Sequence, residues 1–366
     1  MLFRSDGVRR DRAEAGTLAS VPLPVRPVLK PALRQVWRDA VTLQLGLAPQ
    51  RAVVLAGLTP PDSHLFGLLD GSRDVATVFN DASALGCPPE RAVRLIELLA
   101  AADALDDGPP ADPRLEPDLL SLSLLHPGPG AAARVLARRR AASVAVYGAG
   151  RVGAAVATLL AAAGVGKLAV VDEGPVRPGD LGPAGIREQG AGTRATAVVA
   201  PLRRTSAALT VSTLAPERPD VAVVAPVSSV APPEVLAAVR HRAHLLVTMR
   251  ETTAAVGPFV RPGRTPCLRC VHLARADRDP HWAALTAQLT GDSRSVESCD
   301  VILATIAASL AAAQVLAVLD VPDARPATVG GVLEMCLDDG QLRRRSIAAH
   351  PSCGCGAADD SVTMVM

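Results

Sequence analysis

The sequence predicts an α/β protein in which a doubly wound, mostly parallel sheet follows a small winged-helix-like α+β domain. Three observations carry this prediction. Short apolar runs alternate with helical patterns after residue 143, and a glycine-rich turn joins the first of these runs to a helix. Two strand-like runs followed by three helical patterns come before residue 107.

Composition excludes several function classes. The chain has 366 residues, enough for two or three domains, and a net charge of +2, which gives no strong field toward nucleic acid or an anionic membrane. Aromatic residues make up 2% of the chain, so stacking surfaces for single-stranded nucleic acid are few. Seven cysteines without a visible secretory signal favour metal or thiol chemistry and a cytoplasmic location.

The first domain is expected to follow a flexible polar leader. We expect a leader over 1–23, a winged-helix-like domain over 24–107, a linker over 108–142, a nucleotide-binding domain over 143–356 and a tail over 357–366. The strands are "VTLQLG" and "RAVVLAGL", and the helical patterns are "PPDSHLFGLLDG", "DVATVFNDASALG" and "PPERAVRLIELLAAADAL". Two of these patterns begin at Pro-Pro, which suits a first helical turn.

This first domain resembles the PqqD-like peptide-recognition domains of ribosomal peptide maturation systems. The runs that carry the resemblance are "RPVLKPALRQVW", "RAVVLAGL", "LLDGSRDVATVF" and "AVRLIELLAAADALDD". The resemblance implies a domain that binds a leader peptide as an added β-strand. The alternative is a plain winged-helix packing or dimerisation domain. The mixed charge of the helices argues against DNA recognition.

The second domain is predicted from strands that alternate with helices. The strands are "SVAVYG", "KLAVVD", "LTVSTL", "VAVVAP" and "HLLVTM", an order that implies an open, mostly parallel sheet with helices on both faces. The run "VILATIAASLAAAQVLAVL" at 301–319 is long enough to span a membrane. Its alanine content, together with Thr305, Ser309 and Gln314, predicts instead a buried helix of a soluble domain.

The glycine turn indicates nucleotide binding. Gly148, Gly150 and Gly153 form G-x-G-x-x-G between a strand and a helix: the first suits a tight turn, the second allows phosphate to approach, and the third allows close helix–strand packing. The helix N-terminus then offers N–H groups to phosphate. Asp172 ends the next strand, where its carboxylate can accept hydrogen bonds from ribose hydroxyls. A turn kept for packing alone is the alternative.

Two cysteine pairs are spaced for zinc ligation, in "TPCLRC" and "HPSCGCG". The predicted ligands of a closed, structural, tetrahedral site are Cys267, Cys270, Cys353 and Cys355. Two unrelated thiol pairs, or His350 in place of one cysteine, are the alternatives. The other cysteines are expected to be small buried residues: Cys87, Cys299 and Cys336.

Residues 143–356 resemble the E1-like adenylyltransferases of the ThiF and MoeB type. The features that carry the resemblance are "VYGAGRVGAAVATLLAAAGVGKLAVVDEG", "VGPFVRPGRTPCLRC" and the terminal "CGC". The resemblance implies that ATP and Mg²⁺ bind at the glycine turn, that the cysteines hold Zn²⁺, and that the C-terminal carboxylate of a peptide or small protein is adenylated. It also implies a homodimer.

The sequence departs from this family where an aspartate that helps to hold Mg²⁺ is usual. Val227 or Ser228 stands there, and the nearest carboxylates are Asp220, before the strand, and Glu234, in the next helix. Seven residues of strand span about 23 Å, so by simple spacing neither of these carboxylates should reach.

Arginines stand where the family carries an Arg or Gln and then a Lys. The segment after Asp172 offers Arg177, Arg187 and Arg194, and Arg194 is nearest the usual lysine position. We assign catalytic roles to Arg194 and Arg187, with Asp180 as a polar replacement nearby. Arg250 and Glu251, at the end of the fifth strand, form a local ion pair or substitute in part for the missing acid.

The sequence therefore predicts an ATP-dependent adenylyltransferase acting on a peptide or small protein in natural-product peptide maturation. The alternative is a non-catalytic scaffold that binds a leader peptide and presents it to a partner maturation enzyme. An NAD-dependent oxidoreductase accounts for Gly148 and Asp172 but not for the cysteine pairs. Cys299 is a candidate thioester cysteine by elimination only.

Overall fold

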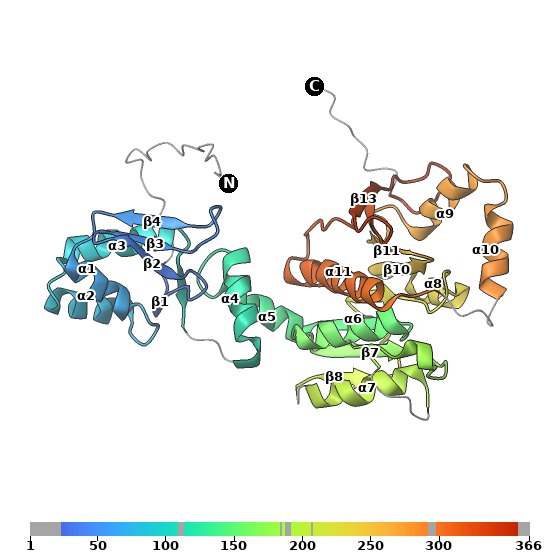
Figure 1. The fold of residues 1–366 in the computed structure, drawn as a ribbon, viewed down its shortest axis with the longest axis horizontal. Helices are drawn as coiled ribbons and strands as arrows, with labels where there is room; N and C mark the ends of the chain where they lie inside the picture. Colours follow the sequence, from blue (N-terminus) through green and yellow to red (C-terminus); the bar gives the residue numbers. More distant parts are fainter. Residues whose placement is uncertain are drawn as a thin grey trace, which may run out of the picture. The chain divides into compact units, whose positions relative to one another are not determined.

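The computed structural model describes residues 23–108, 113–183, 185–186, 192–205, 208–291 and 298–357. The chain divides into two compact units, 1–134 and 135–366, and each is described by itself (Figure 1). The division lies inside the segment expected as a linker, 108–142. That segment contains the short helix η1 (Pro113–Leu115) and the helices α4 (Glu116–Leu125) and α5 (Ala131–Ala141).

The first unit combines an antiparallel three-stranded sheet with three helices. The sheet has the order β2-β3-β4, formed by β2 (Gln35–Asp39), β3 (Thr42–Leu45) and β4 (Val53–Ala56). The helices are α1 (Pro60–Leu68), α2 (Val75–Ala84) and α3 (Pro89–Ala101). Helix α3 buries Ala92, Leu95, Ile96 and Leu99, a spacing of three and four residues that places one face on the core. The predicted hairpin and three helices are all present.

A second, two-stranded sheet in this unit was not predicted. Strand β1 (Pro27–Leu29) pairs antiparallel with β5 (Leu105–Asp107), which follows the third helix. The buried Lys30 follows β1, and its ammonium group lies 2.7 Å from the carboxylate of Asp103 and donates to the carbonyl of Ser123 at 2.7 Å. These bonds attach α4 to the rest of the first unit.

A buried ion pair connects α1 to α3. Asp62 is fully buried, and Arg91 donates to its carboxylate from Nε and Nη2 at 2.6–3.0 Å. The N–H of Thr59 donates to the same carboxylate and completes a capping box at the start of α1. Although burial opposes ionisation, hydrogen bonds from Arg91 and Thr59 hold the pKa of Asp62 below its usual value.

The second unit is built on an eight-stranded sheet with the order β13-β12-β11-β10-β9-β6-β7-β8. The five predicted strands are all present and pair in parallel: β6 (Ser143–Tyr147), β7 (Lys167–Val171), β8 (Thr210–Ser212), β9 (Val221–Val224) and β10 (His244–Arg250). Three further strands add antiparallel pairs: β11 (Thr253–Val260), β12 (Gly331–Cys336) and β13 (Leu342–Ser346). The predicted fold class is confirmed, and the antiparallel half extends it.

Helices cover both faces of this sheet. On one face, α6 (Arg151–Ala162), α7 (Arg194–Thr205) and α11 (Val301–Asp320) share one core with the sheet. On the other face, α8 (Pro233–Val239) packs over Ala222 and Val224 of β9. The helices α9 (Leu268–Ala276) and α10 (Trp282–Gly291) follow β11.

Helix α11 is, among the described residues, the one helix long and apolar enough to cross a membrane. In the structure it is a core helix, as predicted. Leu303, Ala304, Ala307, Ala308 and Ala311 lie in the main core, and α11 packs along α6. Small side chains on this face let the two helix backbones approach closely.

Replacing Arg91 tests the buried pair. Arg91→Gln leaves the Asp62 carboxylate buried without its cation, and we expect a loss of about 2 kcal/mol in the stability of α1 and α3 at pH 7. The folded pKa of Asp62 is depressed, so the pair stabilises above the unfolded pKa and the benefit disappears as pH falls below about 4. Hydrogen–deuterium exchange of α1 and α3 measures both effects.

The matched control is Arg94→Gln, since Arg94 is exposed on the same helix. Equal protection in the two variants at pH 7, or a difference that grows as the pH is lowered, would contradict this account.

Candidate functional site

In the glycine turn at the end of β6, two of the three glycines leave no room for a side chain. Gly148 has φ 93°, and a Cβ there would lie 2.0 Å from the carbonyl oxygen of Ala225. A Cβ on Gly153 would lie 1.9 Å from the carbonyl oxygen of Gly148. These two positions let the turn, β9 and α6 pack in contact, so packing alone accounts for them.

Gly150 occupies a different position, as the N-cap of α6. The first-turn N–H groups of a helix have no acceptor within the helix, and together they form a place for an anion. A Cβ on Gly150 would lie 3.1 Å from Cγ2 of Val227, so the segment after β9 passes close to this helix start. Of the three glycines, Gly150 is the one at the start of α6.

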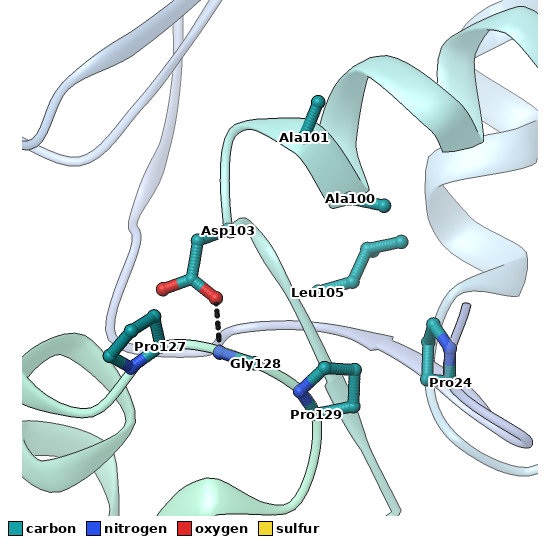
Figure 2. Close-up of a pocket in the computed structure, with 8 residues that line it drawn as sticks. All are labelled: Pro24, Ala100, Ala101, Asp103, Leu105, Pro127, Gly128 and Pro129. Atoms are coloured by element: carbon teal, nitrogen blue, oxygen red, sulfur yellow. Dashed lines mark hydrogen bonds between the residues drawn. The ribbon is translucent and has the colours of Figure 1, made fainter. Parts of the chain in front are cut away.

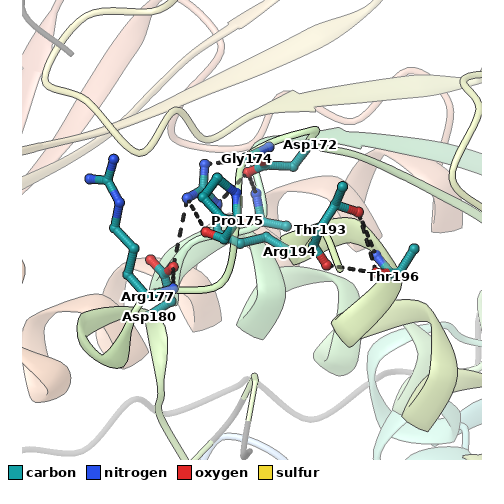
Figure 3. Close-up of polar contacts among 9 residues, drawn as sticks. Asp172, Gly174, Pro175, Arg177, Asp180, Thr193, Arg194 and Thr196 are labelled. Atoms are coloured by element: carbon teal, nitrogen blue, oxygen red, sulfur yellow. Dashed lines mark hydrogen bonds and ion pairs between the residues drawn. The ribbon is translucent and has the colours of Figure 1, made fainter. Parts of the chain in front are cut away.

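Asp172 accepts four N–H groups (Figure 3). One carboxylate oxygen accepts from the N–H of Ala149 at 2.7 Å and from Nε of Arg194 at 2.9 Å. The other accepts from the N–H of Gly174 and from Nη2 of Arg194, both at 2.9 Å. A carboxylate offers about four lone-pair positions, so Asp172 has none left for a ribose hydroxyl in this arrangement.

All three nitrogens of the Arg194 guanidinium group donate hydrogen bonds. Besides its two bonds to Asp172, it donates from Nη1 to the carbonyl of Pro175 at 3.0 Å, and Nη1 lies 3.6 Å from Asp180. Figure 3 shows Asp180 and Asp172 on either side of this side chain. Arg177 is exposed, and Arg187 lies outside the described residues. The structure therefore joins two predicted site residues, Asp172 and Arg194, in a direct ion pair.

The end of β9 brings no carboxylate to the glycine turn. Residues 221–233 contain neither aspartate nor glutamate, and Val227 lies beside Gly150. Asp220 lies at the opposite end of β9, where its carboxylate accepts the N–H of Ser143 at the start of β6. Glu234 is exposed in the first turn of α8. The segment after β9 therefore presents an apolar side chain, that of Val227, to the start of α6.

The structure places three other residues singled out in the sequence, Arg250, Glu251 and Cys299. Arg250 and Glu251 do not form an ion pair, and Glu251 is exposed with φ 43°. Cys299 is half-buried, its carbonyl accepts Nη1 of Arg151 at 2.7 Å, and burial raises the pKa of its thiol. The role of Cys299 as a thioester cysteine stays a prediction.

The four predicted zinc ligands converge. The sulfur of Cys267 lies 3.8 Å from that of Cys270 and 3.6 Å from that of Cys353, and the sulfurs of Cys270 and Cys355 are 3.5 Å apart. All four lie within 4.8 Å of one another. Zinc–sulfur bonds of about 2.3 Å in a tetrahedron require separations of about 3.8 Å, so the cluster fits Zn²⁺.

The clustered thiols shift one another's pKa in opposite directions. Burial, together with hydrogen bonds that its S–H donates to neighbouring thiols, raises the pKa of Cys353 to about 12. Burial acts in the same direction on Cys355, but hydrogen bonds from the Ala357 N–H and the other thiols lower its pKa to about 7. His350 lies 2.8 Å from Asp277 and is not part of the cluster. Of the remaining cysteines, only Cys87 is fully buried.

The first unit has a groove between β4 and α3. Its volume is about 540 Å³, and its walls combine apolar and charged side chains, including Val54, Leu95, Leu98, Glu90 and Arg94. Strand β4 is an edge strand, so one side of it is free to pair with another chain.

A second pocket of about 320 Å³ lies near Asp103, Leu105 and Pro127 (Figure 2). The Asp103 carboxylate there is already bound to Lys30 and to the N–H of Gly128 at 2.8 Å. Since its one carboxylate is occupied, this pocket is a weaker candidate for a polar ligand than the groove beside β4.

Comparison with known proteins supports the resemblance to the ThiF type. The ThiF family model matches residues 129–222, the segment that holds β6, α6, β7, α7 and β8. No curated protein sequence matches the chain. The resemblance to E1-like proteins of the ThiF type is therefore confirmed for this segment, whereas the resemblance to PqqD-like domains stays a prediction.

Solved structures share the fold at low sequence identity. E. coli MccB with succinimide is 16% identical, with a TM-score of 0.66 over 90% of this chain and 98% of MccB. E. coli MccB with ATP is 14% identical, with a TM-score of 0.65 over 90% of this chain and 99% of MccB. PaaA is 15% identical, with a TM-score of 0.64 over 87% of this chain and 99% of PaaA.

Removing one cysteine tests the metal site. Cys267→Ser takes one thiolate from the predicted tetrahedron, and we expect zinc content to fall from about one ion per chain to well below half, with a lower melting temperature. Elemental analysis after dialysis measures the zinc. Cys336→Ser, outside the cluster, should keep it. Equal zinc in both variants would refute the assignment.

Proposed function

We propose that this chain is an ATP-dependent adenylyltransferase that activates the C-terminal carboxylate of a peptide or small protein, in natural-product peptide maturation. One observation carries the proposal: in the segment that matches the ThiF family, the open N-terminus of α6 and the Asp172 carboxylate lie at one edge of the parallel sheet. The shared fold supports it, since E. coli MccB structures include complexes with ATP and with N-formylated MccA.

The chemistry is a transfer of adenylate. A carboxylate oxygen of the substrate attacks the α-phosphorus of ATP, a new C–O–P linkage forms, and the bond to the β-phosphate oxygen breaks to release pyrophosphate. The N–H groups at the start of α6 would bind phosphate oxygens, and Arg194 and Arg187 would neutralise the charge that develops on them. Since the described residues at the end of β9 offer no carboxylate, Mg²⁺ enters the proposal only as the ion that ATP brings.

Nucleotide binding would require an exchange at Asp172. Its four acceptor positions are filled, two of them by Arg194. We propose that ribose hydroxyls replace the guanidinium group on Asp172, and that Arg194 then turns toward the phosphates. A guanidinium group binds phosphate oxygens through two parallel N–H donors, so this movement exchanges one bidentate partner for another.

Arginine replacement with an ATP assay tests this proposal. The native protein should bind ATP in calorimetry and, with the precursor peptide encoded beside its gene, exchange labelled pyrophosphate into ATP. Arg194→Gln should lower the exchange rate about 100-fold, the usual loss when one stabilising charge on a transferring group is removed.

Arg177→Gln is the control, because Arg177 is exposed on the same segment and should leave exchange within about twofold. Absence of ATP binding in a zinc-loaded, folded protein would sink the adenylation proposal.

A second candidate function is a non-catalytic scaffold, which Val227 favours. This apolar side chain lies beside the N-cap of α6, where the family usually has an aspartate. A scaffold would bind the peptide and pass it to a partner maturation enzyme without consuming ATP. Peptide binding with no pyrophosphate exchange would favour this function over adenylation.

We further propose that the first unit binds the leader of a precursor peptide along β4. The free edge of β4 can pair with an extended chain, and the groove toward α3 offers Leu95 and Leu98 to apolar side chains and Arg94 to an acidic one. Both features are open in the structure, which supports this use over a plain packing domain.

Groove substitution in the full chain tests leader binding. Leu98→Asp places a charge in the apolar wall, and we expect the dissociation constant for the fluorescent precursor peptide to rise at least about tenfold. Leu85→Asp is the control, since Leu85 is exposed at the end of α2 and outside the groove. Equal affinities of the two variants would place the peptide elsewhere.

Three other predictions belong with this function. A cytoplasmic location suits free thiols that bind zinc rather than form disulfides. A homodimer and a partner maturation enzyme follow from the family resemblance. Size-exclusion chromatography with light scattering would establish the oligomeric state.

A further inference from the structure

The outer face of the antiparallel half of the sheet carries Glu334 of β12 and arginines of β10 and β13, and a further arginine comes from helix α9. Thr248 of β10 pairs with Ala255 of β11, and Ala255 pairs with Glu334 of β12, so these three side chains share one face. Their neighbours Met249, Ala254 and Leu333 lie on the opposite face, in the core with α6 and α11. Glu334 and Arg250 therefore point away from that core.

The arginine face is defined here as Arg250 of β10, Arg275 of α9 and Arg345 of β13, gathered around Glu334. Arg345 donates to Glu334 at 2.7 Å. The charge of Glu334 acts on all three arginines, and they hold the pKa of Glu334 below its usual value, with the Arg345 hydrogen bond the largest lowering cause. Three elements distant in the chain thus converge on one carboxylate.

The arginine face has more positive than negative charge. Three guanidinium groups surround one carboxylate, and the next acid acting on Arg250 is Glu251, which is exposed. Within the described residues, neither Arg250 nor Arg275 makes a side-chain hydrogen bond or ion pair, although both are half-buried. Burial first, then repulsion from Arg250 and Arg345, lowers the pKa of Arg275 to about 10.

The ring of Trp282 positions one of these free cations. The guanidinium carbon of Arg275 lies 4.9 Å from the ring centroid. Stacking on an aromatic face holds a guanidinium plane while its N–H donors stay available at the edges. Half-buried, unpaired N–H donors with a net positive charge are complementary to an oxyanion such as a carboxylate.

The arginine face lies at a distance from the glycine turn that can be derived from the strand register. Leu246 of β10 is level with Val224 of β9, which is level with Tyr147 of β6. Arg250 lies four residues further along β10 than Leu246, and β10 is the second strand from β6 in the sheet. Strand geometry places Arg250 about 16 Å from the end of β6, a distance that about five residues of extended peptide cover.

We propose that Arg250, Arg275 and Arg345 bind an acidic side chain of the peptide substrate, about five residues before the carboxylate that reacts. The position relative to the reacting end rests on the proposed adenylation, whereas the carboxylate site itself does not. Glu334 holds Arg345 in place and limits the net charge of the site. A substrate with glutamate or aspartate at this distance is preferred over its amide counterpart.

Two synthetic hexapeptides serve as probes, each amidated at its C-terminus and carrying an uncharged fluorophore. One has two glutamates and the other has glutamines at the same positions. Fluorescence anisotropy with the full zinc-loaded chain, without ATP and at low ionic strength, gives both dissociation constants. We expect the glutamate peptide to bind about tenfold more tightly.

Variants of both signs make the test specific. Arg250→Gln and Arg275→Gln should each remove most of the preference for glutamate, whereas Glu334→Gln removes the one carboxylate and should tighten binding of the glutamate peptide about threefold. Arg343→Gln is the control: Arg343 stands opposite Glu334 on β13 and its loss removes the same charge, but its guanidinium group is exposed and already paired with Asp339. It should change binding less than about twofold.

Several outcomes overturn the proposal. Equal affinity for the two peptides removes the carboxylate site, and equal weakening by Arg343→Gln and Arg250→Gln reduces it to general charge attraction. Inorganic pyrophosphate and acetate serve as competitors of the glutamate peptide. If pyrophosphate displaces the peptide at a concentration tenfold lower than acetate does, the face is a phosphate site instead. The binding assay contains no ATP, so it does not depend on adenylation. A glutamate preference here, combined with no exchange in the separate ATP and pyrophosphate assay, would count against adenylation and leave this site standing.

Discussion

The carboxylate of Asp172 is the group on which the geometry of the second unit depends. It accepts N–H groups from the turn after β6, from the turn after β7 and from the first residue of α7. Its side chain is 7% exposed, and a charge at that depth needs a cation and hydrogen bonds, which Arg194 and the two backbone N–H groups supply. One acid thus fixes the relative positions of three segments.

The candidate sites of the two units differ in whether their hydrogen-bonding groups are already occupied. In the second unit the polar groups that would meet a nucleotide already bind one another, so a ligand must exchange partners with Arg194. In the first unit the edge of β4 and its groove are open, and a peptide could pair without displacing any bond. On the arginine face, donors are free while their charge is only partly balanced.

Much of this fold could be predicted because its signals are local. The five parallel strands are short apolar runs, α3 shows helical periodicity, and the cysteine pairs have the spacing of metal ligands. The strands β12 and β13 were missed because "GVLEMC" and "LRRRS" carry charges that are typical of loops. Strand β5 was missed because its partner β1 lies on the other side of three helices in the chain.

The sequence by itself determined which residue types stand at each chemical position: the glycines of the turn, the four cysteines, Asp172 and the absence of an acid near Val227. These follow from backbone sterics and ligand chemistry, which act over a few residues. Only the tertiary structure decided that Arg194 binds Asp172, and that Arg250, Arg275 and Arg345 gather around Glu334. Those contacts join separate elements, and their partners depend on strand order and helix packing, which no local pattern encodes.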